Sequence, residues 1–386
     1  MDLMLINLVP IQSGGGLQNA LSLLSILASE DMTLRVICRS GSAIEQFCDE
    51  CDIPTWPVRN RLMFELYGAR RIAPRGTVCF SLFGPPPRST VGYWVNVCGV
   101  AYSNLFYEDV DFWAFAPFLS RTLRQAKDGI RRSAIARADG WIFETKILLN
   151  RAIARGFPKH RTFHVPMAVS KLVSQAPVRP GIGARDSERM KILYLATAHP
   201  NKRQHLVPKI ASELEALAPG KYTWITTMDE KSPYTQDVLA LATKFDPIVE
   251  IANVGPVDPA YVRELIDSVD ALCLFSVLES FSNNFVESWA SERPIFVTDS
   301  DWARASCRDG AVYINPLDAA DAAARIHDLL SDPERVASVC AAGRMRLAQY
   351  PSADEKARLY VGVLDRFGEL QNCPIEVKRK IWKKGS

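Results

Sequence analysis

Two glutamates eight residues apart flank the stretch of this chain whose residue types are best suited to chemistry. Glu279 and Glu287 lie on either side of Ser280–Asn284, just after a strand-like apolar run, Ala271–Phe275. Open α/β sheets place ligand sites at such strand ends. A helix-like segment follows, and the backbone N–H groups and dipole of its N-terminus favour an anion such as phosphate. Carboxylates accept hydrogen bonds from sugar and ribose hydroxyls, so the pattern suits a sugar nucleotide.

A simpler interpretation of the same residues stays open at this point. Glutamates at this spacing are common, and a glutamate in the first turn of a helix often only complements the helix dipole. A short motif taken alone therefore does not choose between the two interpretations.

The whole segment Val277–Val297 resembles the donor-site signature of retaining glycosyltransferases with the two-domain GT-B fold, of the large family-four type (glycosyl transferases group 1). The shared pattern is Glu, seven residues, Glu, a small-residue helix and a strand that begins with Pro. The resemblance implies that Glu279 lies against the donor sugar and that Glu287 binds the ribose. Ser282 and Glu292 stand where the family usually has glycine. The expected donor-binding set also includes Phe281, Ser282, Asn283 and Asn284.

Two adjacent cations, Lys202 and Arg203, follow another strand-like run and stand near the expected start of a helix. Cations at a helix N-terminus oppose its dipole, so their presence makes more sense with an anion bound, although a charged helix start is the simpler alternative. The resemblance implies that Lys202 grips the donor diphosphate. Ala196 stands where relatives have an arginine, and Arg203 is expected to compensate. Glu279, Lys202 and Arg203 form the predicted catalytic set.

The chain begins with a buried-strand pattern, Leu3–Val9, a run of three glycines, Gly14 to Gly16, and a helical leucine stripe. This order is typical of a nucleotide-binding α/β unit, although it does not match the dinucleotide fingerprint and such a loop is often only a turn. The resemblance implies that Gly15 and Gly16 face the donor phosphates. Cys98 stands where many relatives have a histidine, and we assign it no catalytic role.

Composition limits the class of protein. The chain has 386 residues, a length that predicts two domains. Hydrophobic residues make up 48% and charged residues 23%, which is ordinary for a globular protein. The net charge of +3 is too small to indicate a nucleic-acid surface. Nine cysteines, no leader-like segment and no membrane-spanning run favour a reduced, cytosolic protein. Cys48 and Cys51 form a lone C-x-x-C, which suits a helix face better than a redox pair. None of the five histidines has metal-ligand spacing, so we expect no zinc site.

The order of elements predicts an α/β protein, and the resemblance implies a GT-B fold. In this fold two Rossmann-like, doubly wound parallel-sheet domains face each other across a cleft, with a C-terminal crossover helix. The expected segments are an acceptor-side domain over 1–174, a linker over 175–190, a donor-nucleotide domain over 191–350, a crossover helix packing back on the first domain over 351–372 and a basic tail over 373–386.

Three further regions carry charge or aromatic rings. Arg121–Arg137 reads as a helix with a basic face, either a solvated face or a partner site. The aromatic residues between Tyr102 and Phe118 are mostly core, and some can form an acceptor or membrane-facing lip. The basic tail around Ile381 and Trp382 is either a solvated end or a peripheral anchor on an anionic membrane.

The predicted function is retaining, metal-independent transfer of a sugar from a nucleoside-diphosphate sugar to a glycan or lipid-linked acceptor, in cell-surface polysaccharide synthesis. The donor is a substrate, and no cofactor or nucleic acid is expected. A metal-dependent transferase would need an Asp-x-Asp, for which Asp299 with Asp301, and Asp109 with Asp111, qualify. A sugar-nucleotide epimerase of GT-B fold and an inactive sugar-nucleotide-binding homologue are further candidates.

Overall fold

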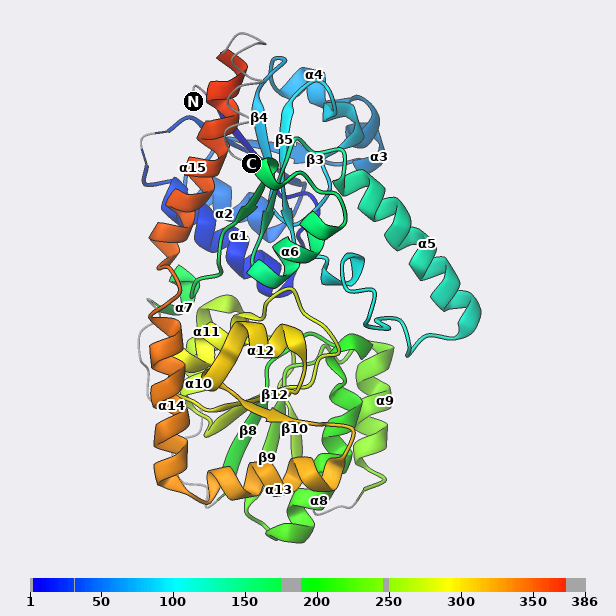
Figure 1. Cartoon of the computed structure of the whole chain (residues 1–386), viewed down its shortest axis with the longest axis vertical. Coiled ribbons are helices and arrows are strands. Elements are labelled where there is room, and N and C mark those ends of the chain that lie inside the picture. The colour runs from blue at the N-terminus through cyan, green and yellow to red at the C-terminus, as the bar shows by residue number, and fades with distance from the viewer. Residues whose placement is uncertain (1–2, 31, 175–188, 246–249, 373–386) are drawn as a thin grey trace. The chain divides into compact units, whose positions relative to one another are not determined.

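The computed structural model describes residues 3–30, 32–174, 189–245 and 250–372 (Figure 1). The chain forms two compact units. Unit 1 contains the chain up to Ala168 and the segment from Pro351 onward, and unit 2 is Val169–Tyr350. The predicted linker, except for its last two residues, and the predicted basic tail lie outside the described residues.

Unit 1 is built on a seven-stranded sheet in which all strands run parallel. The strand order is β3-β2-β1-β4-β5-β6-β7. The strands are β1 (Met4–Asn7), β2 (Leu34–Arg39), β3 (Thr55–Val58), β4 (Val78–Ser81), β5 (Val95–Val100), β6 (Gly140–Phe143) and β7 (Thr162–His164).

Helices cover both faces of this sheet, which is why its central strands are apolar on both sides. They are α1 (Gly14–Leu27), α2 (Ala43–Glu50), α3 (Arg61–Met63), α4 (Ala69–Ile72), α5 (Phe118–Ile135), α6 (Lys146–Ala154) and α15 (Ala353–Asn372). A π-helical turn, Phe64–Gly68, joins α3 to α4. Polar caps set several helix starts: Ser42 accepts from the N–H of Glu45, and Thr145 from that of Leu148.

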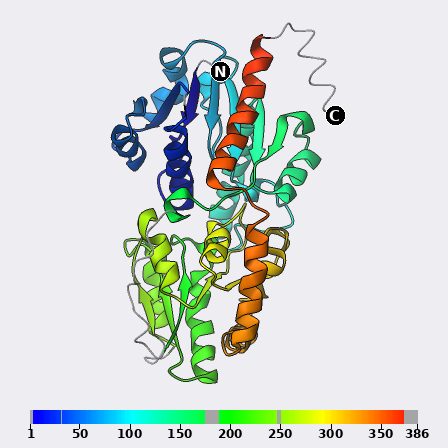
Figure 2. The ribbon, with the colours of Figure 1, turned by 90° about the vertical axis from the view of Figure 1, so that its left-hand side faces the viewer.

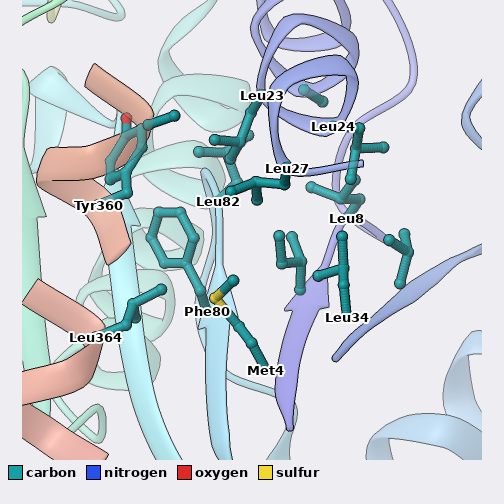
Figure 3. Packing of buried hydrophobic residues seen from close by; sticks show 14 of the residues in the cluster. Met4, Leu8, Leu23, Leu24, Leu27, Leu34, Phe80, Leu82, Tyr360 and Leu364 are labelled. Atoms are coloured by element: carbon teal, nitrogen blue, oxygen red, sulfur yellow. The ribbon is translucent and has the colours of Figure 1, made fainter. Parts of the chain in front are cut away.

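Alternate residues of the central strands enter two different cores, because successive side chains of a strand point to opposite faces. Met4 and Ile6 join the cluster beneath α1 and α15, while Leu5 joins the cluster on the other face. Figure 3 shows the first of these cores, where Tyr360 and Leu364 of α15 pack beside Phe80 of β4. Every residue of β1 is therefore buried.

The last helix, α15, is an integral part of unit 1 (Figure 2). The Tyr360 ring lies 5.0 Å from that of Phe80, and Phe367 packs edge-on to Phe163. Gly140 leaves room for Phe367, since a Cβ at this glycine would lie 2.2 Å from the end of that ring. Close contacts with three strands thus fix α15 on the sheet.

Unit 2 contains a six-stranded parallel sheet of order β10-β9-β8-β11-β12-β13. The strands are β8 (Met190–Tyr194), β9 (Tyr222–Thr226), β10 (Ile251–Asn253), β11 (Ala271–Leu274), β12 (Ile295–Thr298) and β13 (Val312–Ile314). The helices are α7 (Lys171–Ser174), α8 (Val207–Leu217), α9 (Pro233–Ala242), α10 (Val262–Asp267), α11 (Asn283–Ala290), α12 (Asp301–Cys307), α13 (Ala319–Leu330) and α14 (Pro333–Leu347).

The predicted α/β class with two parallel-sheet, Rossmann-like domains is confirmed. Strand β5 begins only at Val95, because Thr90 ends a 3₁₀ turn and its carbonyl accepts from the N–H of Trp94. The first unit ends at Ala168, and α7 contacts α10 of unit 2. Within the described part of the chain, no helix combines the length and hydropathy needed to cross a bilayer.

Candidate functional site

The order of strands in unit 2 creates one natural ligand position. The chain runs from β8 outward through β9 to β10, then returns to the other side of β8 and continues from β11 to β13. The connections after β8 and β11 therefore leave the sheet in opposite directions from neighbouring strands. In open α/β sheets, ligands bind at the carboxyl ends of the strands at such a switch point. The loop after β8 carries Lys202, and the loop after β11 carries Glu279.

Lys202 and Glu279 meet at this switch point. The Lys202 Nζ lies 2.5 Å from a carboxylate oxygen of Glu279, and both side chains are partly exposed, at 21% and 14%. A lysine ammonium has several donor hydrogens, so a pair with one carboxylate leaves others available to a ligand. The structure brings together two of the three predicted catalytic residues, with a cation and an anion side by side in reach of solvent.

Buried polar groups tie the two loops together. The Tyr194 hydroxyl, at the end of β8, donates to the carbonyl of Lys202 and accepts from the N–H of Phe275 at 2.8 Å. Burial raises the pKa of this phenol well above its usual value, so it stays protonated and able to donate. Asn201 accepts from the N–H of Val277 and donates its amide to the carbonyl of Leu278. The backbone beside both charged residues is therefore held in place.

Helix α11 begins at the same switch point. Ser282 precedes its first turn in an extended conformation, and the Ser282 side chain makes no capping hydrogen bond to the helix. The Asn284 amide donates to the carbonyl of Leu195, and the Phe281 ring packs on Phe285 and Tyr350. Since these side chains are engaged within the protein, the N-terminal turn offers a ligand mainly its backbone N–H groups and its dipole.

Glu287 lies in the second turn of α11 with only 2% of its surface exposed. A carboxylate is rarely buried to this extent unless hydrogen bonds or an opposite charge stabilise it. The predicted ribose-binding residue is thus a deeply placed carboxylate on the helix that starts at the switch point.

Arg203 departs from the expected geometry. The sequence places Lys202 and Arg203 at a helix entrance, but Pro200–Lys202 forms a 3₁₀ turn and α8 begins only at Val207, with Pro208 in its first turn. Arg203 has a left-handed backbone conformation, with φ of 54°. Burial lowers the pKa of its guanidinium. No carboxylate within 4 Å pairs with Arg203 in the parts of the chain that the structure covers, so a half-buried cation remains beside the switch point.

The predicted glycine loop lies in unit 1, at the switch point of that sheet between β1 and β4. Gly14 has a φ of 65°, a conformation that favours glycine. Gly15 and Gly16 form the first turn of α1, and a Cβ at Gly16 would meet its neighbours only at ordinary distances. A role for Gly15 and Gly16 in phosphate binding stays a prediction.

Cys98 has the character of a core residue. Cys98 is completely buried and donates from Sγ to the carbonyl of Gly84. Burial raises the pKa of its thiol, which opposes a nucleophilic role. Cys48 and Cys51 are both free, the first buried in α2 and the second exposed just after it.

Three of the four aspartates of the metal-dependent alternative are paired with arginines. Arg304 binds both carboxylate oxygens of Asp299, Arg151 binds both of Asp109, and Arg121 lies 2.6 Å from Asp111. The Arg304 guanidinium lowers the pKa of Asp299. No cluster of three or more candidate metal ligands is found in the portion of the chain described here.

Sequence reasoning missed the residues that support the site. Besides Tyr194 and Asn201, His199 accepts from the N–H of Asn201 through Nδ1, and the buried Gln204 donates to the carbonyl of Thr197. His205 contacts the hydroxyl of Tyr234, and burial lowers the pKa of this histidine. Their only sequence signal is the unusual density of polar residues over His199–His205, which does not reveal their partners.

Comparison with known proteins agrees with this geometry. Residues 180–346 match the family model described as Glycosyl transferases group 1. No curated protein matches the chain by sequence. Among solved structures, a glycosyltransferase from Rickettsia africae aligns with 12% identity over 95% of this chain and 98% of its own, with a TM-score of 0.70.

Two further solved structures have the same fold. Sucrose-phosphate synthase from Thermosynechococcus elongatus has 14% identity, coverage of 95% and 98% and a TM-score of 0.69. The HepE protein of Anabaena, solved with UDP and glucose, has 15% identity, coverage of 95% and 99% and a TM-score of 0.67. The family match spans the switch point with Lys202, Glu279 and Glu287. Residues 180–346 thus match the glycosyl transferases group 1 family, within a chain that has the two-domain GT-B fold.

Proposed function

We propose that this chain is a retaining, metal-independent glycosyltransferase that moves a hexosyl group from a nucleoside-diphosphate sugar to a glycan or lipid-linked acceptor. The observation that carries the proposal is the pair of Lys202 and Glu279 at the switch point of unit 2, 2.5 Å apart. Transfer of a sugar needs positive charge to stabilise the leaving diphosphate and a hydrogen-bond acceptor to orient the sugar hydroxyls. The pair supplies both in one place.

In the proposed reaction the bond between the anomeric carbon and the diphosphate oxygen breaks, and the oxygen leaves with the electron pair. Lys202, Arg203 and the N–H groups at Ser282–Asn284 stabilise this developing charge, so the protein supplies what a metal ion supplies elsewhere. The acceptor hydroxyl oxygen then bonds to the anomeric carbon, and its proton passes to the oxygen of the departing diphosphate. No cofactor takes part, since the donor is itself a substrate.

Glu279 is proposed to orient the donor sugar, and Glu287 to bind the ribose. Backbone N–H groups near Gly15, Gly16, Phe281 and Ser282 complete the proposed donor contacts. The solved Anabaena protein binds UDP and glucose, which supports a nucleotide sugar as the class of donor here. Retention of configuration is supported by the likeness of the segment Val277–Val297 to the family-four donor signature.

The proposed setting is the cytoplasm, with polysaccharide synthesis as the process and a peripheral contact with an anionic membrane through the basic tail at 373–386. That tail lies outside the described residues, so its sequence alone supports the contact.

The test is a panel of nucleotide sugars, followed first by thermal shift and then by release of nucleoside diphosphate with and without acceptors. A ligand at a hundred times its dissociation constant stabilises a protein by about 2.7 kcal/mol, which such a screen detects. NMR of the product should show the anomeric configuration of the donor, and EDTA should leave the rate unchanged. An inverted product would refute retention, loss of turnover in EDTA would refute metal independence, and conversion of the donor to its epimer without acceptor would favour the epimerase.

A further inference from the structure

Helix α5 presents its apolar stripe to solvent. Leu119, Leu123, Ala126 and Ile130 recur at the spacing that places them on one helix face. Leu119 is 77% exposed, Leu123 64% and Ile130 63%, and Phe118 beside them is 79% exposed. An ordinary surface helix buries such a stripe against the core. We call these five residues the apolar face of α5.

The opposite side of α5 is the one that packs on unit 1, and this side is charged. Asp128 accepts from the amide of Asn104 at 2.7 Å and from the indole N–H of Trp113 at 2.6 Å. The Arg124 guanidinium lies over the Trp113 ring, and that of Arg131 over the ring of Tyr102. Figure 1 shows α5 at the edge of unit 1. Several specific polar contacts therefore fix the helix with its apolar face outward.

Positive charge flanks the apolar face. The segment 118–137 holds six basic residues and one acidic residue, Asp128. Lys127, Arg132 and Arg137 are exposed. Helical spacing places Lys127 at the border of the apolar face and Arg132 on the far side, while Arg137 follows the C-terminal end of the helix. Exposed cations thus lie at one border of the face and beyond its end, a charge pattern that complements a negatively charged surface.

We propose that the apolar face of α5 is an insertion surface for an anionic lipid bilayer. The helix has 18 residues, a length of about 27 Å, and its single narrow stripe with flanking cations is the form of a helix that lies in the plane of a membrane interface. Lys127 and Arg137 bind lipid headgroups, while Phe118, Leu119, Leu123 and Ile130 enter the acyl boundary. A second copy of this chain would bring like charges together at the flanks, which disfavours self-association.

This surface lies in unit 1 and includes none of the donor-site residues of unit 2, so it stands apart from the proposed transferase chemistry. It also differs from the tail at 373–386, and the two can be separated by truncation.

The experiment is co-sedimentation of the full chain with vesicles, without any sugar nucleotide. Vesicles of phosphatidylglycerol mixed with phosphatidylcholine are compared with vesicles of phosphatidylcholine alone. The test variant is Leu119→Ser with Leu123→Ser and Ile130→Ser. A matched control replaces three exposed apolar residues of unit 2, namely Leu217→Ser, Leu317→Ser and Met345→Ser, which are 52%, 63% and 71% exposed. Thermal unfolding checks that both variants fold. A chain ending at Cys373 shows how much of the vesicle binding depends on the tail.

The expected result is binding of wild type to the anionic vesicles, reduced more than about tenfold in the test variant and unchanged in the control. Lys127→Ala with Arg137→Ala should reduce binding at 0.1 M salt and have little effect at 1 M, since the Debye length falls from about 10 Å to about 3 Å. Equal binding of test variant and wild type overturns the proposal, as does binding that disappears with the tail alone. A wild-type protein that ignores anionic vesicles overturns it too, and a dimer lost in the test variant would assign the face to a second copy.

Discussion

The hydroxyl of Tyr194 accepts a hydrogen bond from the backbone N–H of Phe275 at 2.8 Å, which joins the ends of β8 and β11 at the switch point of unit 2. The same hydroxyl donates to the carbonyl of Lys202. One buried phenol therefore links the strand that precedes Glu279 to the loop that carries Lys202.

Tyr194→Phe removes this link and leaves a buried N–H and a carbonyl without their partner. An unsatisfied buried polar group costs about 1–3 kcal/mol, so we expect a loss of stability in that range in urea unfolding. Donor turnover should fall as well, because the backbone at Lys202 is no longer held. As a control, Tyr261→Phe alters a half-exposed tyrosine of the same unit. Unchanged stability and turnover in Tyr194→Phe would show that the link has no importance.

Glu287→Gln tests the proposed ribose contact with little change in volume. A hydrogen bond to a charged group contributes about 1.5–3 kcal/mol, so the affinity for the donor nucleotide should weaken at least about tenfold. Calorimetric titration with nucleoside diphosphates measures this, and circular dichroism checks the fold. The assignment fails if a folded Glu287→Gln protein binds the nucleotide as tightly as wild type.

Lys202→Ala with Arg203→Ala tests the diphosphate role. Charge stabilisation in the transition state should be lost, and loss of such a group lowers kcat by about a hundredfold or more. Lys209→Ala, an exposed lysine on α8, is the matched control and should behave as wild type. Full kcat in the double variant would remove both residues from the proposed mechanism.

Lys356 gives a prediction about pH and stability. This lysine of α15 is buried, with its Nζ 3.0 Å from the sulfur of Met167, and desolvation lowers its pKa to about 8 despite the opposing charge of Glu144. The unfolded chain, with an ordinary lysine pKa near 10.5, binds more protons between these two values. The contribution of Lys356 to stability therefore rises with pH from about 8 to about 10.5, by roughly 3 kcal/mol at most.

The measurement is urea unfolding of wild type and Lys356→Met across this pH range. Buried cysteines titrate in the same region with the opposite sign, because burial raises the pKa of Cys38 and Cys48 to about 12. They are common to both proteins, so the difference between the two profiles isolates the lysine. The free energy of unfolding should rise less with pH in Lys356→Met, and parallel profiles would contradict the prediction.

Gly140→Ala tests the docking of α15 on unit 1. The new Cβ would lie 2.2 Å from the Phe367 ring, and overpacking of this kind costs about 1–3 kcal/mol. Phe367→Leu in the same chain should recover part of the loss, because it shortens the opposing side chain. Gly362→Ala in α15 is the control, because a Cβ at this position would meet no atom within 4 Å. Gly156→Ala is less suitable, because its φ of 89° strains any residue other than glycine. Additive effects of Gly140→Ala and Phe367→Leu would contradict the contact.

Local patterns predicted the buried strands that precede the site loops, and they misplaced the start of one helix. Buried parallel strands are apolar over their whole length, so β1 and β11 were evident from residue type. The predicted start of α8 was wrong, because the 3₁₀ turn at Pro200–Lys202 delays the helix to Val207. Short turns depend on hydrogen bonds between particular backbone groups, which hydrophobic periodicity does not record.

By itself the sequence determined the alternation of strands and helices and the chemical types at the site, Lys202, Glu279 and Glu287, because both follow from residue type and short-range order. Only the tertiary structure decided which of these groups meet. Lys202 and Glu279 pair since β8 and β11 are neighbours in the sheet, and Tyr194 holds their loops through a hydroxyl whose partners are distant in sequence. The outward apolar face of α5 likewise depends on the chain around Trp113, since a helical stripe specifies a face and its surroundings decide where that face points.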